Sequence, residues 1–438
     1  MRVLEPRSIL AWVAALGLLA FAAHACGTDG SGRPSLPSDL PEYEHSGPIG
    51  PATLFQHGVA SGDPHADAVV IWTRVSPESP EGVDSVEVFY EMALDQDFED
   101  RTAAGSVTTG ASRDFTVKVD VHDLKWGRDY YYRFALDGRW SPIGRTRLAP
   151  KGGEVSQLRF AVCVGSSYAR GYYHGYRHIA ARADLDAVLH LGDYYYEYGN
   201  EYYEERNGLV RPHEPPHEAV TLGDYRTRLS QARRDPDLQE VHRQHPFIWI
   251  WDDHETANDS WVGGAENHDP DEGPWEERVA AATQALFEWM PIRDDGEQHI
   301  YRAFEYGELA DLIMLDTRLE GREEPFDAGP TGIFTPGDPA LPNRIMSATQ
   351  EGWLQTQISN NTARWKIIGN QVAVSNWQLV DPVSGKVDYF GADQWHGYPG
   401  SRDRLLSFLR ESGPSNVVFV SGDRHISIVM DVTIDDGS

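Results

Sequence analysis

The sequence has few cysteines and few basic residues. Two cysteines in 438 residues cannot build a disulfide scaffold. Lysine and arginine total 38 against 68 aspartates and glutamates, which gives a formal net charge of −30 at pH 7. This charge repels nucleic-acid phosphates, so we expect no binding to a nucleic-acid duplex. The same charge argues against phosphate-ester chemistry unless bound cations reverse the local sign.

The sequence also lacks a long apolar run at its N-terminus, because residues 9–23 are short for a membrane-spanning helix. Two arginines precede this run and small residues follow it, which is typical of an export signal over residues 1–26. "AHAC" resembles a bacterial lipoprotein cleavage box and predicts lipidation of Cys26, with ordinary cleavage near Ala25 as an even alternative. We expect export to the bacterial envelope, in the periplasm or at the cell surface, where a lipid on Cys26 would be the only membrane anchor.

Three regions follow one another along the chain. Residues 27–50 are rich in glycine, serine and proline and predict a flexible linker. Short alternating runs separated by turn residues predict an antiparallel β-sandwich over residues 51–150. Over residues 156–438 strands alternate with helices, which predicts an α/β fold with a β-sheet core and flanking helices.

Polar residues gather at the carboxyl ends of the strands predicted in the α/β region. Open α/β sheets bind ligands at this edge. Carboxylate oxygens and imidazole nitrogens from several strand ends suit a site for two cations, a common device for hydrolysing phosphate esters. The candidates at these strand ends are Asp193, Asp253, His254, Asn370, Asp423 and His425.

Two further features support a metal site. Tyr196 lies three residues after Asp193, where a turn can direct both side chains inward, and a phenolate is a hard anionic ligand suited to ferric iron. His254, next to Asp253, can protonate a leaving oxygen or hold a phosphate oxygen. Each pattern alone has a plainer interpretation, such as a turn, a helix N-terminal acid cluster or a packed aromatic face. Their joint occurrence at consecutive strand ends favours the metal site.

Several segments resemble, in order, the motifs of the PhoD-like alkaline phosphatases and phosphodiesterases, a family of the metallophosphoesterase superfamily. They include "HGVASGDP", "VIWTRV", "DAVLHLGDYYYEYG", "PFIWIWDDHE", "LIMLDTR", "ARWKIIGNQV" and "SGDRH". The resemblance implies an exported enzyme that hydrolyses small phosphomonoesters, phosphodiesters or both, by in-line attack of a metal-bound hydroxide. A phospholipase-D-like diesterase acting on lipid head groups is one alternative, and a degenerate, non-catalytic envelope binding protein is the other. We expect a monomer.

The resemblance also implies a ferric iron and a calcium ion, with Asp193 bridging the metals and Tyr196 binding the iron. It implies that Asp253, Asp423 and His425 complete the metal ligands and that His254 is the catalytic residue. For Arg318, a phosphate contact and an ion pair that braces the sheet are equal alternatives. The candidate contacts to metal or phosphate are Asn258, Asn370 and Arg318. We expect Arg170 to be a solvated surface arginine, with a phosphate contact as the alternative.

The sequence departs from the family at Gly165, where family members carry an iron-binding cysteine. Cys163 lies two residues earlier, about 6–7 Å further back along the strand, so we expect it to be a small buried hydrophobic residue. Ser166, Ser167 or water can supply an oxygen ligand instead, and we expect weaker iron binding or another metal. The chain also ends soon after His425, which predicts a C-terminally truncated sequence or, alternatively, a natural short variant.

Overall fold

The computed structural model describes residues 54–77, 83–153, 155–335 and 341–433. The predicted signal segment with Cys26, the whole predicted linker of residues 27–50 and the residues up to 53 lie outside the described residues. Among the helices that the structure describes, none combines the length and the apolar character that crossing a membrane requires.

The largest sheet joins the two regions that the sequence presents as sandwich and α/β region. β1 pairs antiparallel with β2 and parallel with β11, so one sheet continues across the predicted boundary near residue 150. Gly62 permits this junction, since a Cβ there would lie 2.7 Å from the carbonyl oxygen of Phe247. The strand order is β5 (Thr116–Val121), β2 (Val69–Arg74), β1 (Val59–Gly62), β11 (Pro246–Trp249), β10 (Ala187–His190) and β9 (Phe160–Cys163).

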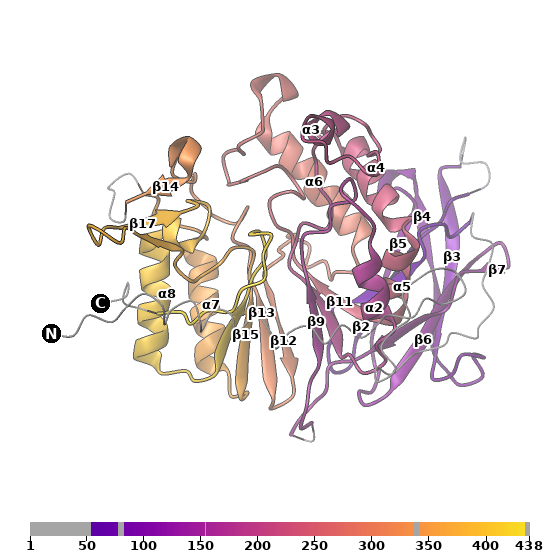
Figure 1. Cartoon of the computed structure of the whole chain (residues 1–438). Helices are drawn as coiled ribbons and strands as arrows, with labels where there is room; N and C mark the ends of the chain where they lie inside the picture. Colours follow the sequence, from indigo (N-terminus) through magenta and orange to yellow (C-terminus); the bar gives the residue numbers. More distant parts are fainter. Residues whose placement is uncertain (1–53, 78–82, 154, 336–340, 434–438) are drawn as a thin grey trace, which may run out of the picture.

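A five-stranded antiparallel sheet forms the other layer of the N-terminal sandwich (Figure 1, indigo to purple). Val69 and Ile71 of the large sheet pack with Val88, Tyr132 and Phe134 of this layer in one buried cluster. The antiparallel strands predicted for this region are thereby confirmed. The strands are β4 (Arg101–Gly110), β3 (Ser85–Ala93), β6 (Asp129–Leu136) and β7 (Arg139–Trp140), with β8 (Gly144–Arg147) also paired to β6.

The C-terminal part builds a four-stranded sheet with two helices on its outer side (Figure 1, orange to yellow). Ile313 and Ile368 of this sheet pack with Leu354 of α7 and Leu405 of α8. The sheet is ordered β12 (Arg302–Tyr306), β13 (Ala310–Met314), β15 (Trp365–Gly369) and β18 (Val417–Val420), and the helices are α7 (Ala348–Asn360) and α8 (Pro399–Ser412). A small sheet of β14 (Ile333–Phe334), β17 (Val387–Phe390) and β16 (Gln378–Val380) completes this part.

The remaining helices lie between or after the strands β9, β10 and β11 along the chain. Residues 222–244 form two helices, because Asp235 and Pro236 start a new one: Asp235 caps its N-terminus and Pro236 occupies its first position. The helices are α2 (His174–Ala180), α3 (Asn200–Glu205), α4 (Leu222–Arg233), α5 (Pro236–Gln244) and α6 (Trp275–Trp289). Short 3₁₀ turns are η1 (Ala111–Arg113), η2 (Pro270–Glu272), η3 (Gly329–Thr331) and η4 (Trp395–Gly397).

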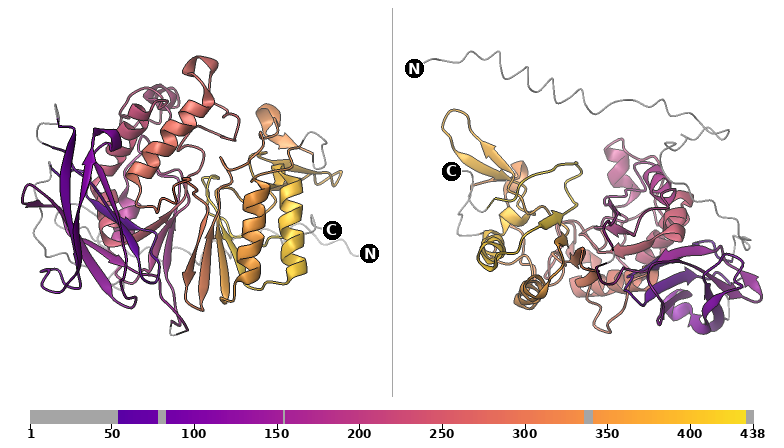
Figure 2. Two further views of the ribbon diagram at one scale, coloured as in Figure 1. Left: turned by 180° about the vertical axis from the view of Figure 1, so that it is seen from behind. Right: turned by 90° about the horizontal axis from the view of Figure 1, so that it is seen from below.

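The six-stranded and four-stranded sheets share a core. Val188 and Ile248 of the first belong to the same buried cluster as Phe304, Leu312 and Met314 of the second. Figure 2, seen from behind, shows α7 and α8 on the side of the four-stranded sheet that faces away from the larger one. Strands β9, β10 and β11 run parallel, as do β13, β15 and β18. The loops that follow these strands carry the predicted site residues.

Candidate metal centre

The loops after β10 and β11 approach each other closely. Gly192 has φ 97° and Asp193 has φ 51°, so both residues adopt left-handed backbone conformations. A Cβ on Gly192 would lie 2.3 Å from the backbone nitrogen of Asp252, so only glycine fits there. The Gly-Asp pair after β10 is therefore required by the meeting of two loops, and the left-handed Asp193 is a strained position of the kind found at functional sites.

Glu255 holds these two loops together. Its fully buried carboxylate accepts the backbone N–H groups of Asp193 at 3.0 Å, Tyr194 at 2.6 Å and Asp252 at 2.7 Å. Burial raises the pKa of Glu255 to about 7, although these backbone donors oppose the shift. The sequence analysis missed Glu255, whose signal was its place in "WDDHE", two residues after the predicted ligand Asp253.

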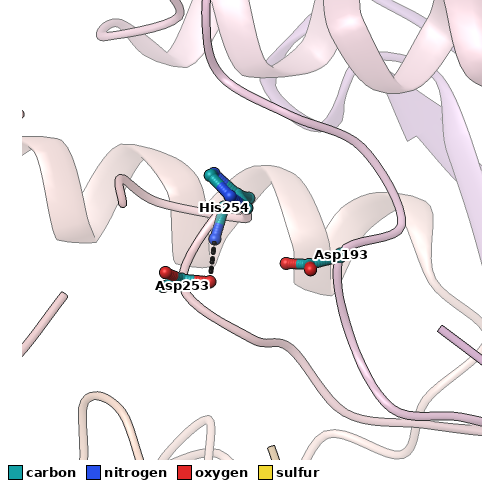
Figure 3. Close-up of side chains that lie close together, drawn as sticks. All are labelled: Asp193, Asp253 and His254. Atoms are coloured by element: carbon teal, nitrogen blue, oxygen red, sulfur yellow. Dashed lines mark hydrogen bonds between the residues drawn. The ribbon is translucent and has the colours of Figure 1, made fainter. Parts of the chain in front are cut away.

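Asp193, Asp253 and His254 bring potential ligand atoms within 4.8 Å of one another. Figure 3 shows the carboxylates of Asp193 and Asp253 facing each other from separate loops. The Oδ1 atom of Asp193 is buried and has no hydrogen-bond partner among the residues that the structure describes. Burial, and then the carboxylate of Asp252, raise the pKa of Asp193 well above its usual value. A cation would neutralise this arrangement, so the residues present fit a metal ion with oxygen and nitrogen ligands.

Tyr196 lies within the same cluster. Its hydroxyl donates to Oδ2 of Asp193 at 3.2 Å and lies 3.2 Å from Nε2 of His425. Burial, followed by the charges of Asp193 and Asp253, raises the pKa of Tyr196 far above its usual value, so the phenol stays protonated unless a cation replaces the proton. The structure thus brings these predicted ligands together, and their coordination of a metal stays a prediction.

His254 is oriented by a buried acid. Its Nδ1 lies 2.7 Å from Oε2 of Glu197, and Glu197 also accepts the backbone N–H of Asn258 at 2.8 Å. Burial lowers the pKa of His254, but Glu197 and Asp253 outweigh burial and raise this pKa well above its usual value. Because Nδ1 is engaged, Nε2 is the nitrogen left for the cavity that His254 lines. The sequence analysis also missed Glu197, although it belongs to the motif "DYYYEYG".

Arg318 lies at the centre of a second acidic cluster. Its fully buried guanidinium donates from Nε to Asp252 at 2.5 Å, from one terminal nitrogen to Asp393 at 2.7 Å and from the other to Asp423 at 3.1 Å. Its second terminal nitrogen also lies 3.7 Å from Asp253. Of the two roles that the sequence left open, these contacts favour the ion pair, since every nitrogen of the guanidinium faces a carboxylate.

Asp423 closes the site from the opposite sheet. Its Oδ1 accepts from Arg318 and its Oδ2 from Nε2 of Gln394 at 2.5 Å. Burial, and then the charge of Asp393, raise the pKa of Asp423 to about 6. One oxygen of Asp423 lies within 4.8 Å of ligand atoms of Asp252 and Asp253. A second group of potential ligands therefore shares Asp253 with the first group.

Asn370 and Asn258 have different surroundings. Asn370 is fully buried, its Oδ1 accepts from Nε1 of Trp395 at 2.9 Å, and its Nδ2 donates to Oγ of Ser421 at 2.9 Å. Its Oδ1 accepts one hydrogen bond here and has a second lone pair, as amide oxygens do. Asn258 lines the cavity, and its amide donates to Glu266. For both asparagines, contact with metal or phosphate stays a prediction.

Gly165 and Cys163 lie on the same side of the centre. Gly165 has φ 71°, and a Cβ there would lie 3.7 Å from the hydroxyl of Tyr196. A longer side chain at this position would therefore reach the cluster. The thiol of Cys163 instead lies 3.8 Å from the carbonyl oxygen of Leu189, and burial raises its pKa to about 12. Cys163 packs against the core, as expected, but it is only partly buried and also lines the cavity.

A cavity of about 1060 Å³ opens beside the centre. Tyr196, His254 and His425 line one end, and Tyr172 and Tyr202 belong to the wall beyond. Its volume is that of a site for an organic molecule rather than for a bare ion.

The fold and the site define a layered α/β protein whose acidic and histidine cluster lies at the carboxyl ends of facing parallel strands. The chain matches the sequence profile of the PhoD-like phosphatase family over residues 160–437. It also matches the N-terminal domain of PhoD-like phosphatases over residues 47–150. The chain therefore belongs to the PhoD-like phosphatase family, as its motifs predict.

Two relatives are similar over most of the chain. Alkaline phosphatase D of Bacillus subtilis (strain 168) is 36% identical over 397 residues, which cover 87% of this chain and 66% of that protein. A solved structure described as "Structure of PhoD" matches with a TM-score of 0.78 and 35% identity, covering 87% of this chain and 73% of the other. The predicted fold class is confirmed by this match. The chain spans less than two thirds of the length of the curated relative.

Proposed function

We propose that this chain is an exported, metal-dependent phosphoesterase that hydrolyses small phosphodiesters, phosphomonoesters or both. The observation that carries the proposal is the buried Oδ1 of Asp193, which has no partner among the described residues and faces Asp253 and His254. Membership of the PhoD-like phosphatase family supports the same chemistry. The motif at residues 1–26 supports export, with Cys26 as the proposed lipid anchor.

The proposed ligands divide between two ions. Asp253 belongs to both groups of potential ligands, and the hydroxyl of Tyr196 lies beside Asp193 and His425. The residues that would hold the two ions are Asp193, Tyr196, Asp253, Asp423 and His425. When bound, the ions would supply a Lewis acid for the phosphate oxygens and lower the pKa of a water. Oxygen and imidazole ligands suit calcium and ferric iron. Gly165 offers no side chain, so we propose that iron binds less firmly here than to a site with a thiolate.

His254 would donate a proton to the leaving oxygen. Its raised pKa keeps the imidazole protonated at neutral pH, and Glu197 fixes Nδ1 so that the proton on Nε2 faces the cavity. Arg318 would act indirectly, because it neutralises part of the charge of Asp252, Asp393 and Asp423 and thereby lets these carboxylates gather beside the proposed ions.

Hydrolysis of a chromogenic diester and monoester tests the proposal. The full chain is treated with chelator, reloaded with calcium and iron, and assayed with bis-p-nitrophenyl phosphate and p-nitrophenyl phosphate. We expect turnover that the chelator abolishes and the metals restore, and the ratio of the two rates assigns the substrate class. Absence of turnover with either metal, in protein whose circular dichroism is native, would support the degenerate binding protein instead.

A further inference from the structure

The cavity beside the metal centre has a second polar corner that the proposed chemistry does not use. The loop after β9 and the helix α3 form this corner, which Ser167, Arg170 and Tyr203 line. The loop also contacts the metal centre, because the backbone N–H of Ser166 donates to the backbone oxygen of Asp193 at 2.7 Å. A ligand bound at the centre therefore has this corner within the same cavity.

Arg170 gives the corner its positive charge. It is the only arginine or lysine among the described residues that line the cavity. Its guanidinium lies over the ring of Tyr203, 5.5 Å from the centroid, and makes no ion pair with any carboxylate that the structure describes. Its charge also contributes, after burial, to a lowered pKa of His425. Arg170 is thus close enough to influence charges at the metal centre.

Two hydroxyl groups complete the corner. Tyr203 is 1% exposed, and neither its hydroxyl nor the buried Oγ of Ser167 has a hydrogen-bond partner in the described parts of the chain. Burial raises the pKa of Tyr203, while the nearby Ser167 hydroxyl opposes this shift, so both groups are neutral donors. Buried polar groups are rarely left unsatisfied. The two hydroxyls lie near each other but do not hydrogen-bond to each other, so with the guanidinium they form a donor set that suits a phosphate.

The wall of the cavity is nearly free of acidic residues. The chain has 68 aspartates and glutamates, but Asp423 supplies the only carboxylate among the described lining residues, and Arg318 pairs with it at 3.1 Å. Elsewhere the wall consists of tyrosines, small residues and a few apolar side chains. An anionic ligand can therefore occupy this cavity without the repulsion expected over most of the surface.

We propose that Arg170, Ser167 and Tyr203 bind a second phosphate group of the substrate, beyond the ester that is cleaved. The inference rests on the proposed phosphoesterase function and specifies its substrate class: phosphodiesters that carry a further phosphate. Tyr172, which is 64% exposed, and Tyr202 would contact the organic part that links the two phosphates. Aromatic rings beside a cation suit such a linker when it is apolar or flat.

A matched pair of chromogenic diesters tests this inference. The two substrates are the p-nitrophenyl ester of thymidine 5′-phosphate and the same ester with an additional 3′-phosphate. Both release the same chromophore, p-nitrophenol, and they differ only in the second phosphate. We expect kcat/KM to be about tenfold higher for the 3′-phosphorylated ester, the effect of one charge-assisted contact. The preference should arise from a lower KM.

Variants of the corner should reduce this preference. Arg170→Ala should bring the ratio of the two kcat/KM values close to one, and Arg170→Lys should keep an intermediate ratio. Tyr203→Phe, which keeps the ring beneath Arg170, should lower the ratio about threefold. Arg410→Ala is the matched control, because Arg410 is an exposed arginine on α8 and does not line the cavity. Equal kcat/KM values in the unaltered protein, or a full preference in Arg170→Ala, would overturn the inference.

A binding experiment separates this inference from the proposed function. Calorimetry of the chelated full chain with thymidine 3′,5′-bisphosphate needs no hydrolysis. We expect binding that Arg170→Ala weakens about tenfold and Arg410→Ala leaves unchanged. If no diester is hydrolysed but this binding is observed, the phosphoesterase proposal fails and the anion subsite stands. If the esters are hydrolysed and the bisphosphate binds equally to Arg170→Ala, the subsite fails and the function stands.

Discussion

Asp193 and Asp423 both follow a parallel strand at its carboxyl end, but their surroundings differ. Oδ1 of Asp193 is buried without a partner among the described residues, and Tyr196 alone donates to Oδ2. Both oxygens of Asp423 accept hydrogen bonds, from Arg318 and from Gln394. Asp423 thus shares the charge of Arg318, whereas the charge of Asp193 is left for a bound ion. The partners of a carboxylate at a strand end decide how strongly its charge depends on a metal.

The largest expected effect on activity comes from a change at Asp193, whose Oδ1 has no hydrogen-bond partner among the described residues. Asp193→Asn keeps the size of the side chain and removes the charge that faces Asp253 and His254. We expect diester hydrolysis to fall by about three orders of magnitude or more, since metal binding and substrate activation both depend on this carboxylate. Steady-state kinetics checks this, with Asp403→Asn on the exposed side of α8 as control. Native rates in Asp193→Asn would remove Asp193 from the site.

The acidic cluster around Arg318 should lose stability when this arginine is removed. Arg318→Met leaves Asp252, Asp393 and Asp423 buried without their shared partner. Breaking a buried ion pair on one side costs about 3–5 kcal/mol, which urea unfolding measures directly. If the variant does not accumulate as folded protein, Arg318→Lys should fold and show a smaller loss. Unchanged stability in Arg318→Met would show that Arg318 does not stabilise this cluster.

A change at Glu197 tests how this acid controls the proposed proton donor, His254. Glu197→Gln keeps a hydrogen-bond acceptor near Nδ1 of His254 but removes the charge that raises its pKa. We expect kcat to fall about 10- to 100-fold, the usual effect of losing such a supporting carboxylate. The alkaline limb of the kcat profile should also move to lower pH, because His254 then loses its proton more easily. A loss of kcat without that displacement would indicate a purely structural role.

The pH dependence of stability should report on the buried charge of Asp193. The pKa of Asp193 is raised in the folded state, so the folded protein holds its proton more tightly than the unfolded chain does. Without metal, stability should therefore fall as pH rises above about 4, where the unfolded carboxyl ionises. Asp193→Asn should be more stable than the chelated parent at pH 8, measured by urea unfolding. Calcium should stabilise the parent and have little effect on the variant.

The smallest expected effect concerns Gly165. Gly165→Cys places a thiol beside Tyr196, since a Cβ there lies 3.7 Å from its hydroxyl. We expect iron affinity to rise about tenfold, less than an unstrained thiolate would give, because φ of 71° costs a non-glycine residue about 1 kcal/mol or more. Competition with a chelator and the visible absorption of an iron–thiolate pair measure the gain. Unaltered affinity would show that the missing thiolate does not limit metal binding.

Much of the candidate site was predictable because parallel strands end at a common edge. Asp193, Asp253 and His425 follow apolar runs in the sequence, and the structure brings their loops together. Glu255 and Glu197 were not predicted, because they act through hydrogen bonds to backbone groups and to an imidazole from other segments. A sequence does not reveal which acid in a motif faces inward when the loop adopts left-handed conformations.

The fold was predictable to a similar degree. The alternation of strands with helices was visible in the sequence, and Pro236 is a local signal for a helix start. Helix α7 gives a weaker signal, because few of its side chains, such as Leu354 and Ile358, are buried apolar residues. The pairing of β1 with β11 joins residues nearly two hundred positions apart and has no local signal. The role of Arg318 was left open because its partners come from three distant segments.

The pairing of β1 with β11 has a consequence for how the protein unfolds. Ser61 and Gly62 lie against Pro246 and Phe247, so β11 lies between β1 and β10 and is not an edge strand. A chain without the N-terminal region would present the backbone of β11 as an open edge, which invites pairing with other chains. The N-terminal layer is therefore a permanent part of the scaffold that holds the loop of Asp252–Glu255. The two regions should melt in one cooperative transition.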